Sequence, residues 1–286
     1  MNLRQVRKKI KSISNVKKIT KAMQMVSSIK MRKAQAAEIE GRPYRSGLQE
    51  IMEKISPGAD PSFSKLMSTK NAKDKGKTLC IFVTSNKGLC GGFHVNLSRH
   101  IIKNYDYKSA DFISVGKKGS VFLGKLGRTV IADFSSHMFL TEVSAIFELA
   151  LNKFLSGEYK KVDVIYSQFL STLKNEIITQ QLLPVSLDFA KPKDKKDLTG
   201  EYLIEPSPNE ILDFVLRSYV EDKIRGAIVS SEAVEHSSRM IAMKNATDNA
   251  NDVIYNFTLL SNKLRQEKIT GELLDMVTAK ESVETN

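Results

Sequence analysis

The sequence predicts an α/β fold in which a long helix at each end of the chain joins an antiparallel coiled coil, while the middle forms a separate α/β domain. Three observations support this prediction. Residues 1–40 contain neither Gly nor Pro, the segment after Pro208 contains only two glycines, and the middle alternates between strand-like and helix-like apolar patterns. Uninterrupted terminal helices and an alternating middle are typical of this combination.

The N-terminal segment is predicted to be a helix with one apolar stripe. Apolar side chains recur at steps of three and four from Leu3 to Ile29, as on one face of a helix. Gly41 and Pro43 are expected to break or weaken this helix, and the stretch SPGADPS at 56–62 is expected to end it. Residues 1–45 carry 13 Lys and Arg and two acidic residues, against a net charge of +12 for the whole chain. We therefore expect this helix to attract an acidic partner.

The C-terminal segment is predicted to be a longer helix with a coiled-coil seam. From Met240 to Leu264 the seam positions alternate in steps of three and four, and many of them are small or polar, which suits close helix approach. A single helix over residues 209–286 would be about 115 Å long at about 1.5 Å per residue. A compact globule of this chain length has a radius of gyration of only about 19 Å, so we expect an elongated molecule.

The middle of the chain is predicted to form a mostly parallel, Rossmann-like sheet with an edge hairpin. Strands are expected at 77–85, 111–116, 128–134, 161–171 and 175–186, and helices at 93–105, between the second and third strands, and at 141–157. Alternation of strands and helices favours parallel pairing. Pro184 fits the end or the edge of a strand because it cannot donate a ladder hydrogen bond.

These elements divide the chain into five predicted segments. They are an N-terminal coiled-coil helix at 1–56, a linker at 57–76, the α/β domain at 77–190, a charged and mobile linker at 191–208, and a C-terminal coiled-coil helix at 209–286. No segment approaches the roughly 20 apolar residues that span a bilayer, and no apolar signal peptide follows Met1. We therefore expect a soluble or peripheral protein.

The stretch GLCGG at 88–92 raises the possibility of a phosphate-binding loop. Its glycines match neither the dinucleotide fingerprint nor the Walker pattern, so we interpret it as a tight turn that packs the next helix on its strand. Cys80 is expected to be buried and Cys90, in the loop, to be more accessible. No catalytic constellation, metal site or cofactor site is expected, because two cysteines and scattered histidines do not form one.

The residues alone leave several functions open. The chain could be an interaction protein without chemistry of its own, a nucleotide-dependent α/β enzyme with coiled-coil arms, or a basic coiled-coil protein that binds nucleic acid. Residues 1–43 contain no aromatic side chain, which argues against nucleic-acid binding. The N-terminal helix is also basic enough for a transit peptide, although its stripe continues past Glu38.

Four motifs resemble the gamma subunit of the F-type ATP synthase, in its bacterial form. They are MVSSIKMRKAQ at 25–35, GLCGGFHVN at 88–96, EHSSRMIAMKNATDNANDVI at 235–254 and NKLRQEKITGELLD at 262–275. The resemblance covers the whole chain, and the C-terminal motifs are the most specific. Departures occur near the C-terminus, where Gly271 replaces the usual Gln, Leu274 stands where Thr is common, and Ala279-Lys280 replaces Gly-Ala.

The resemblance implies a central rotor shaft without an active site, metal or cofactor. In that role the chain couples c-ring rotation, driven by protons or sodium ions, to ATP synthesis or hydrolysis at the beta subunits. The implied partners are three alpha and three beta subunits, the epsilon subunit and the membrane c-ring, with no nucleic acid. The implied location is peripheral, at the cytoplasmic face of the bacterial plasma membrane, with membrane contact only through the complex.

The resemblance also implies which residues contact the ring of alpha and beta subunits. Met23 matches the position that passes the acidic lever of a beta subunit, with Lys18 and Lys21 close by, and Cys90 lies in the loop that faces this lever. The matching residues of the C-terminal helix are Arg239, Arg265, Gln266, Thr270 and Glu272.

Overall fold

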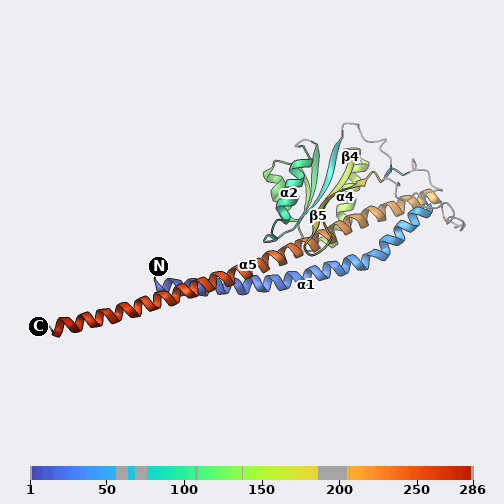
Figure 1. Ribbon diagram of the computed structural model, residues 1–286. Coiled ribbons are helices and arrows are strands. Elements are labelled where there is room, and N and C mark those ends of the chain that lie inside the picture. Colours follow the sequence, from blue (N-terminus) through green and yellow to red (C-terminus); the bar gives the residue numbers. More distant parts are fainter. Residues whose placement is uncertain are drawn as a thin grey trace. The chain divides into compact units, whose positions relative to one another are not determined.

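A computed structural model describes residues 2–55, 64–67, 76–106, 109–136, 138–185, 205 and 207–284 (Figure 1). The helices are α1 (Leu3–Ile55), α2 (Phe93–Asn104), α3 (Lys117–Lys125), α4 (Val143–Leu155) and α5 (Pro208–Glu284), with a short 3₁₀ helix η2 (Phe139–Glu142). The strands are β1 (Lys77–Val83), β2 (Ala110–Val115), β3 (Val130–Phe134), β4 (Tyr159–Phe169) and β5 (Asn175–Leu183).

The chain divides into two compact units. Met1–Ser27 and Arg239–Asn286 form the first, here called the helical unit, and Ser28–Ser238 form the second, here called the sheet unit. The predicted long terminal helices and central α/β sheet are thus confirmed. Most of the two predicted linkers, together with the stretch at 56–62, lies outside the described residues.

Of the two alternatives expected at Gly41 and Pro43, a break or a weak point, the break does not occur, because α1 continues through both residues to Ile55. Proline removes one backbone donor and disturbs the preceding turn. Here Arg45 Nη2 reaches back and donates to the Glu38 carbonyl oxygen at 3.0 Å and to its carboxylate at 2.6 Å. Beyond the proline, buried side chains of the last turns, Leu48, Met52 and Ile55, belong to the core of the sheet unit. Tertiary packing therefore holds the helix where local propensity would end it.

The sheet has the strand order β3-β2-β1-β4-β5. β1 pairs in parallel with both β2 and β4, β2 pairs in parallel with β3, and β5 pairs antiparallel with β4. This confirms the predicted mostly parallel sheet with an edge hairpin. β5 ends at Leu183, directly before Pro184, since proline cannot extend the ladder.

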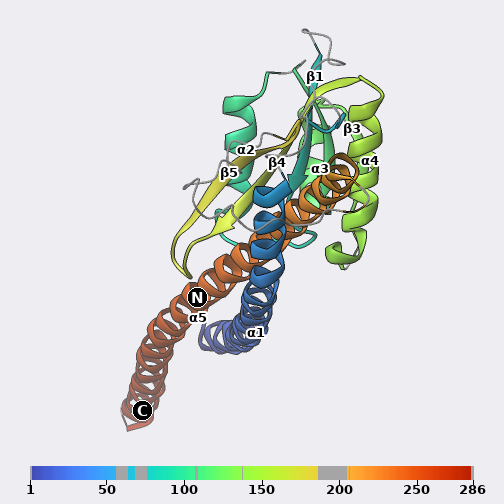
Figure 2. The same ribbon diagram turned by 90° about the vertical axis from the view of Figure 1, so that its right-hand side faces the viewer.

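Helices cover both faces of the sheet. On one face, alternate residues of β1 such as Leu79 and Ile81 pack in a cluster with buried side chains of α4, α5 and the end of α1. On the other face, Cys80 and Phe82 pack in a cluster with residues of α2 and α3, including Leu97. Figure 2 shows α2 and α4 on opposite sides of the sheet. β1 is buried on both faces, which explains its uninterrupted apolar run.

Two buried carboxylates anchor the amino-terminal part of the sheet. Asp111 of β2 accepts hydrogen bonds from Tyr159 Oη at 2.9 Å and from Lys77 Nζ at 3.1 Å. Asp163 of β4 pairs with Lys161 at 2.7 Å and accepts a hydrogen bond from Tyr105 Oη at 3.2 Å. Such partners offset the desolvation of a buried charge.

The glycine stretch forms the turn from β1 to α2, as predicted. Leu89 and Gly91 adopt left-handed backbone conformations with φ of 62° and 56°, and Phe93 then starts a helix whose buried face packs on the sheet. The expected accessibility of Cys90 is wrong, because this side chain is only 2% exposed. The turn points Leu89 outward instead, while Cys90 joins the buried cluster that contains Phe82 and Phe93.

Within the described part of the chain, no helix combines the length and apolarity that a membrane span requires. The same residues contain no group of three or more His, Cys, Asp or Glu side chains arranged to hold a metal ion.

α3 approaches the end of β1 so closely that a methyl group does not fit between them. A Cβ atom on Gly119 would lie 2.7 Å from Thr84 Oγ1 and 2.9 Å from Ser114 Oγ. Gly119 N also donates to Thr84 Oγ1 at 3.0 Å, so the contact cannot open without loss of this hydrogen bond. Gly124, in the same helix, has open space around its Cα atom.

We expect Gly119→Ala to lower the free energy of unfolding by about 1–3 kcal/mol, because added volume in a packed site forces its neighbours apart. Gly124→Ala is the matched control and is expected to raise it by up to about 1 kcal/mol, since alanine favours helix. Urea unfolding followed by circular dichroism measures both. Equal shifts in the two variants would contradict the proposed close contact.

Candidate functional site

The helical unit is built on a seam of small and polar residues. Thr20 Oγ1 of α1 lies 2.8 Å from Thr247 Oγ1 of α5, and both residues are buried. Each hydroxyl also donates to a carbonyl oxygen of its own helix, Thr247 Oγ1 to Met243 at 2.8 Å and Thr20 Oγ1 to Lys17 at 3.1 Å, so either hydroxyl can be the donor between the helices. Short side chains let the two backbones approach closely.

The first helix begins sharply at a reciprocal cap. Gln5 N donates to Asn2 Oδ1 at 2.9 Å, and Asn2 N donates to Gln5 Oε1 at 3.2 Å. This is the capping-box arrangement with Asn and Gln as the two partners. The spacing N-x-x-Q at residues 2–5 is the sequence pattern typical of this cap, and the start of the helix was predicted without it.

The register of the seam leaves the end of α5 without a facing helix. Thr20 opposes Thr247, and Lys9 Nζ lies over the Phe257 ring, 5.6 Å from its centroid. Continuing in this antiparallel register, Leu3 comes opposite the neighbourhood of Leu264. Figure 1 shows α5 continuing past the start of α1 within this unit. From Arg265 to Lys280, every residue is exposed except the half-buried Gly271.

The free end of α5 carries an apolar stripe. We define the tip stripe as Ile269, Leu273, Met276 and Val277, all of them exposed. Their spacing of three and four residues places them on one helix face. Exposed apolar side chains on one face mark an interaction surface. The seam predicted from the sequence ends at Leu264 and does not include this stripe, although its residues have the same three–four spacing.

The residues predicted to contact a ring differ in exposure along α5. Four of them are exposed, namely Arg265, Gln266, Thr270 and Glu272. Glu272 forms an ion pair with Lys268 at 3.2 Å. Leu264 is half-buried. Arg239, in contrast, is only 7% exposed. A ring contact of Arg239 or of the buried Cys90 stays a prediction for which the folded chain offers little surface.

α1 presents a concentrated positive charge. We define the basic face as Arg4, Arg7, Lys8, Lys11, Lys18 and Lys21, all exposed. Their positions fall within a wide arc of one side of the helix. Among the described residues, no salt bridge links this face to a carboxylate, and Lys21 Nζ donates only to Gln24 Oε1, at 3.3 Å. Met23 lies beside it and is half-buried.

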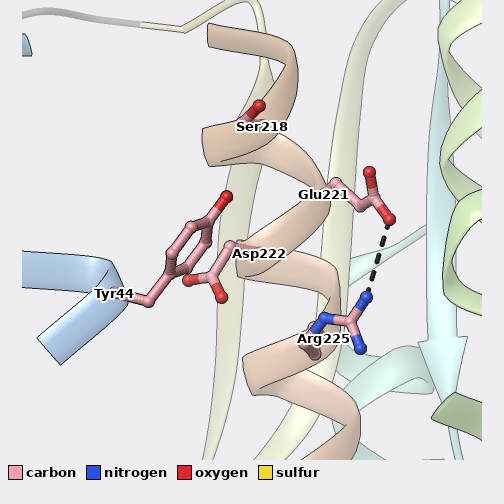
Figure 3. Close-up of a pocket in the computed structure, with 5 residues that line it drawn as sticks. All are labelled: Tyr44, Ser218, Glu221, Asp222 and Arg225. Atoms are coloured by element: carbon pink, nitrogen blue, oxygen red, sulfur yellow. Dashed lines mark ion pairs between the residues drawn. The ribbon is translucent and has the colours of Figure 1, made fainter. Parts of the chain in front are cut away.

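The sheet unit holds an open pocket of about 300 Å³, lined by Tyr44, Ser218, Glu221, Asp222 and Arg225 (Figure 3). Arg225 pairs with Glu221 at 3.6 Å, and Ser144 Oγ donates to Glu221 Oε1 at 2.7 Å. Burial raises the pKa of Asp222 above its usual value, although Arg45, Arg225 and Lys223 act in the opposite direction. No sequence pattern indicated this pocket, because Tyr44 joins the four lining residues of α5 only in the folded chain.

Comparison with known proteins identifies the family of this chain. The sequence model of the family described as ATP synthase matches residues 2–283. The ATP synthase gamma chain of Akkermansia muciniphila is 38% identical over 99% of each chain. The ATP synthase gamma chain of Moorella thermoacetica is 34% identical over 96% of this chain and 97% of that one.

Solved structures share the fold at lower identity. The chain from the rotor of the Euglena gracilis mitochondrial ATP synthase superposes with a TM-score of 0.63 at 19% identity, covering 93% of this chain and 98% of that one. The chain from the central stalk and c-ring of the Tetrahymena thermophila mitochondrial enzyme gives a TM-score of 0.59 at 23% identity, covering 80% and 99%. The near full-length match to the family model and to the bacterial relatives shows that the chain belongs to the ATP synthase gamma chain family.

Proposed function

We propose that this chain is the central rotor shaft of a bacterial rotary ATP synthase, turning inside a ring of three alpha and three beta subunits. The observation that carries the proposal is the free end of α5, which extends past the start of α1 and exposes side chains on all sides. A helix end of this kind needs a surrounding partner. The relationship to gamma chains and the similarity to solved rotor and central-stalk structures support this assignment.

The tip stripe suits a partner that surrounds a turning helix. Each apolar side chain of this size contributes about 1.5–3 kcal/mol when it moves from water into a packed apolar site. Apolar contacts are non-directional, so a ring can hold the tip stripe in more than one rotational position. A set of specific hydrogen bonds around the whole helix would favour one position instead.

The basic face of α1 suits acidic levers on the ring. Its charges are exposed and unpaired within the described chain, so a partner carboxylate can reach them. Exposed ion pairs contribute only about 0–1 kcal/mol each. Such pairs can form and break at successive positions during rotation without holding the shaft in place.

The chain is proposed to carry no chemistry of its own. The glycine stretch lacks the spacing that cradles phosphate, and its turn directs Cys90 into the core. The nucleotide-dependent enzyme and the nucleic-acid-binding protein are both disfavoured by the family relationship. In the proposed role, ATP is made or hydrolysed at the beta subunits, and a c-ring driven by protons or sodium ions supplies the torque.

The other proposed partners are the epsilon subunit and the c-ring. The similar solved structures belong to assemblies that contain a c-ring together with the central stalk or F1. The chain would then be peripheral at the cytoplasmic face of the plasma membrane, and it would reach the membrane only through this complex.

We expect the chain to purify from native membranes with alpha and beta subunits, one copy for each ring of three pairs. The isolated chain should neither bind nor hydrolyse ATP, while its addition to alpha and beta subunits should raise their turnover. Subunit quantification, equilibrium dialysis with ATP and ATPase assays measure these outcomes. Micromolar ATP binding by the isolated chain, or purification without alpha and beta subunits, would overturn the proposal.

Charge reversal tests the basic face. We expect Lys18→Glu with Lys21→Glu to lower assembly or ATP turnover, and to do so more at low than at high ionic strength, because salt screens exposed charges. Lys125→Glu with Lys160→Glu makes the same change in net charge on exposed positions of the sheet unit and serves as the control. A loss that does not depend on salt would indicate damaged packing rather than a charge contact.

Arg265 and Gln266 are expected to contact the ring, whereas Leu264 supports the coiled coil. Replacing Arg265 and Gln266 with Ala should lower ATPase activity of the complex, since a charge-assisted hydrogen bond contributes roughly 1.5–3 kcal/mol, and should leave melting of the free chain unchanged. Leu264→Ala should lower the free energy of unfolding by roughly 1–2 kcal/mol, below the full cost for a buried leucine. Early melting of the Arg265/Gln266 variant, or its normal ATPase activity, would refute this division of roles.

A further inference from the structure

Asp222 is a buried carboxylate without a direct partner in the described chain. It is only 7% exposed, lies on α5 in the sheet unit, and lines the pocket that Figure 3 shows. Among the described residues, none makes a hydrogen bond or an ion pair with it. Burial of an unpaired carboxylate is costly, so this residue differs from Asp111 and Asp163, which have two partners each.

The neighbouring cations are already engaged by other groups. Arg45 pairs with Glu38 at 2.6 Å, and Arg225 pairs with Glu221 at 3.6 Å. Lys223 Nζ lies over the Tyr219 ring, 5.0 Å from its centroid. These cations act on Asp222 only at a distance, and burial outweighs them, so that the pKa of its carboxyl group lies above the usual value.

The rest of the pocket has the chemistry of a cation receptor. The Tyr44 side chain, 57% exposed, lies beside the Asp222 carboxylate. Ser218 precedes Asp222 by one helical turn and supplies a hydroxyl group, and the exposed Phe214 precedes Ser218 by another turn. A carboxylate beside an aromatic face attracts an ammonium or guanidinium group, by charge and by cation–π interaction.

We propose that the Asp222 pocket, meaning the five lining residues of Figure 3, receives a lysine or arginine side chain of a partner subunit. The cationic head of that side chain pairs with Asp222, and its methylene stem lies against Tyr44. This inference rests on the proposed function, which places partner subunits around the chain. An open pocket of about 300 Å³ has room for such a side chain.

A metal ion fits the pocket less well than an organic cation. Glu221 already accepts a hydrogen bond from Ser144 and forms an ion pair with Arg225. Asp222 alone would then supply a carboxylate, whereas divalent cations take several oxygen ligands. An organic cation needs only one carboxylate and a neighbouring ring.

The test uses the complex purified from membranes through a tag on an alpha or beta subunit. Asp222→Asn keeps the shape and removes the charge. Glu176→Gln, at an exposed position on β5, makes the same change in net charge and is the matched control. We expect Asp222→Asn to weaken retention of one partner subunit about tenfold, which corresponds to ~1.4 kcal/mol, and to shift its release to lower KCl concentration. Glu176→Gln should behave like the wild-type complex.

Two further measurements separate the contact from misfolding. The free Asp222→Asn chain should melt at or above the wild-type temperature at neutral pH. Because the pKa of Asp222 is raised in the folded chain, the folded state loses stability as pH rises through this pKa and the carboxyl group ionises. Asparagine cannot ionise and removes this cost. Tyr44→Leu should weaken retention as well, because it removes the ring but keeps an apolar side chain at this exposed position.

A density map of the complex identifies the occupant. A partner Lys or Arg nitrogen within ion-pair distance of the Asp222 carboxylate would establish the inference. A pocket filled by solvent, by a metal ion or by an uncharged side chain would overturn it, as would equal KCl profiles for Asp222→Asn, Glu176→Gln and wild type. In each of these cases the proposed rotor function stands if alpha and beta subunits still co-purify. Failure of the wild-type chain to co-purify with any subunit would overturn both.

Discussion

The structure depends on α5 remaining one continuous helix while the face that it buries changes along its length. In its first turns, large aliphatic side chains such as Leu216 and Ile224 belong to the core of the sheet unit. Farther along, Met243, Thr247 and Ala250 are buried in the seam of the helical unit. At its end no described side chain is buried. One element thus supplies a globular core, a thin coiled-coil contact and a free tip, each through its own choice of side chains.

The thin seam has consequences for the helical unit. Small and polar residues such as Thr20 and Thr247 bury little apolar area. The pairing of the two helices therefore depends on the close approach of their backbones and on the hydroxyl hydrogen bond between them. Apolar side chains that a thicker coiled coil would bury remain outside it, including Ile19 on α1 and Leu259 on α5. These exposed apolar side chains are available to a surrounding partner.

Charge is treated differently in the core and at the surface. Asp111 and Asp163 are buried with a lysine and a tyrosine each, so their desolvation is offset within the chain. Lys18 and Lys21 are exposed and make no ion pair with the described residues. Asp222 falls between these cases, since it is buried like the first pair but unpaired like the second. Charged groups without an ion-pair partner in the isolated chain are candidates for pairing with other subunits.

The sequence by itself determined the elements and their type. Its three–four apolar periodicity predicted α1 and α5, its alternation predicted a parallel sheet with an edge hairpin, and its motifs predicted the family. These features are local, because helix and strand periods are written in neighbouring residues. Only the tertiary structure decided that α1 runs through Pro43, that Cys90 is buried, and that Asp222 lacks a partner. Burial and pairing depend on residues brought together from distant parts of the chain, such as Tyr44 and Asp222, and no local pattern records which of them will meet.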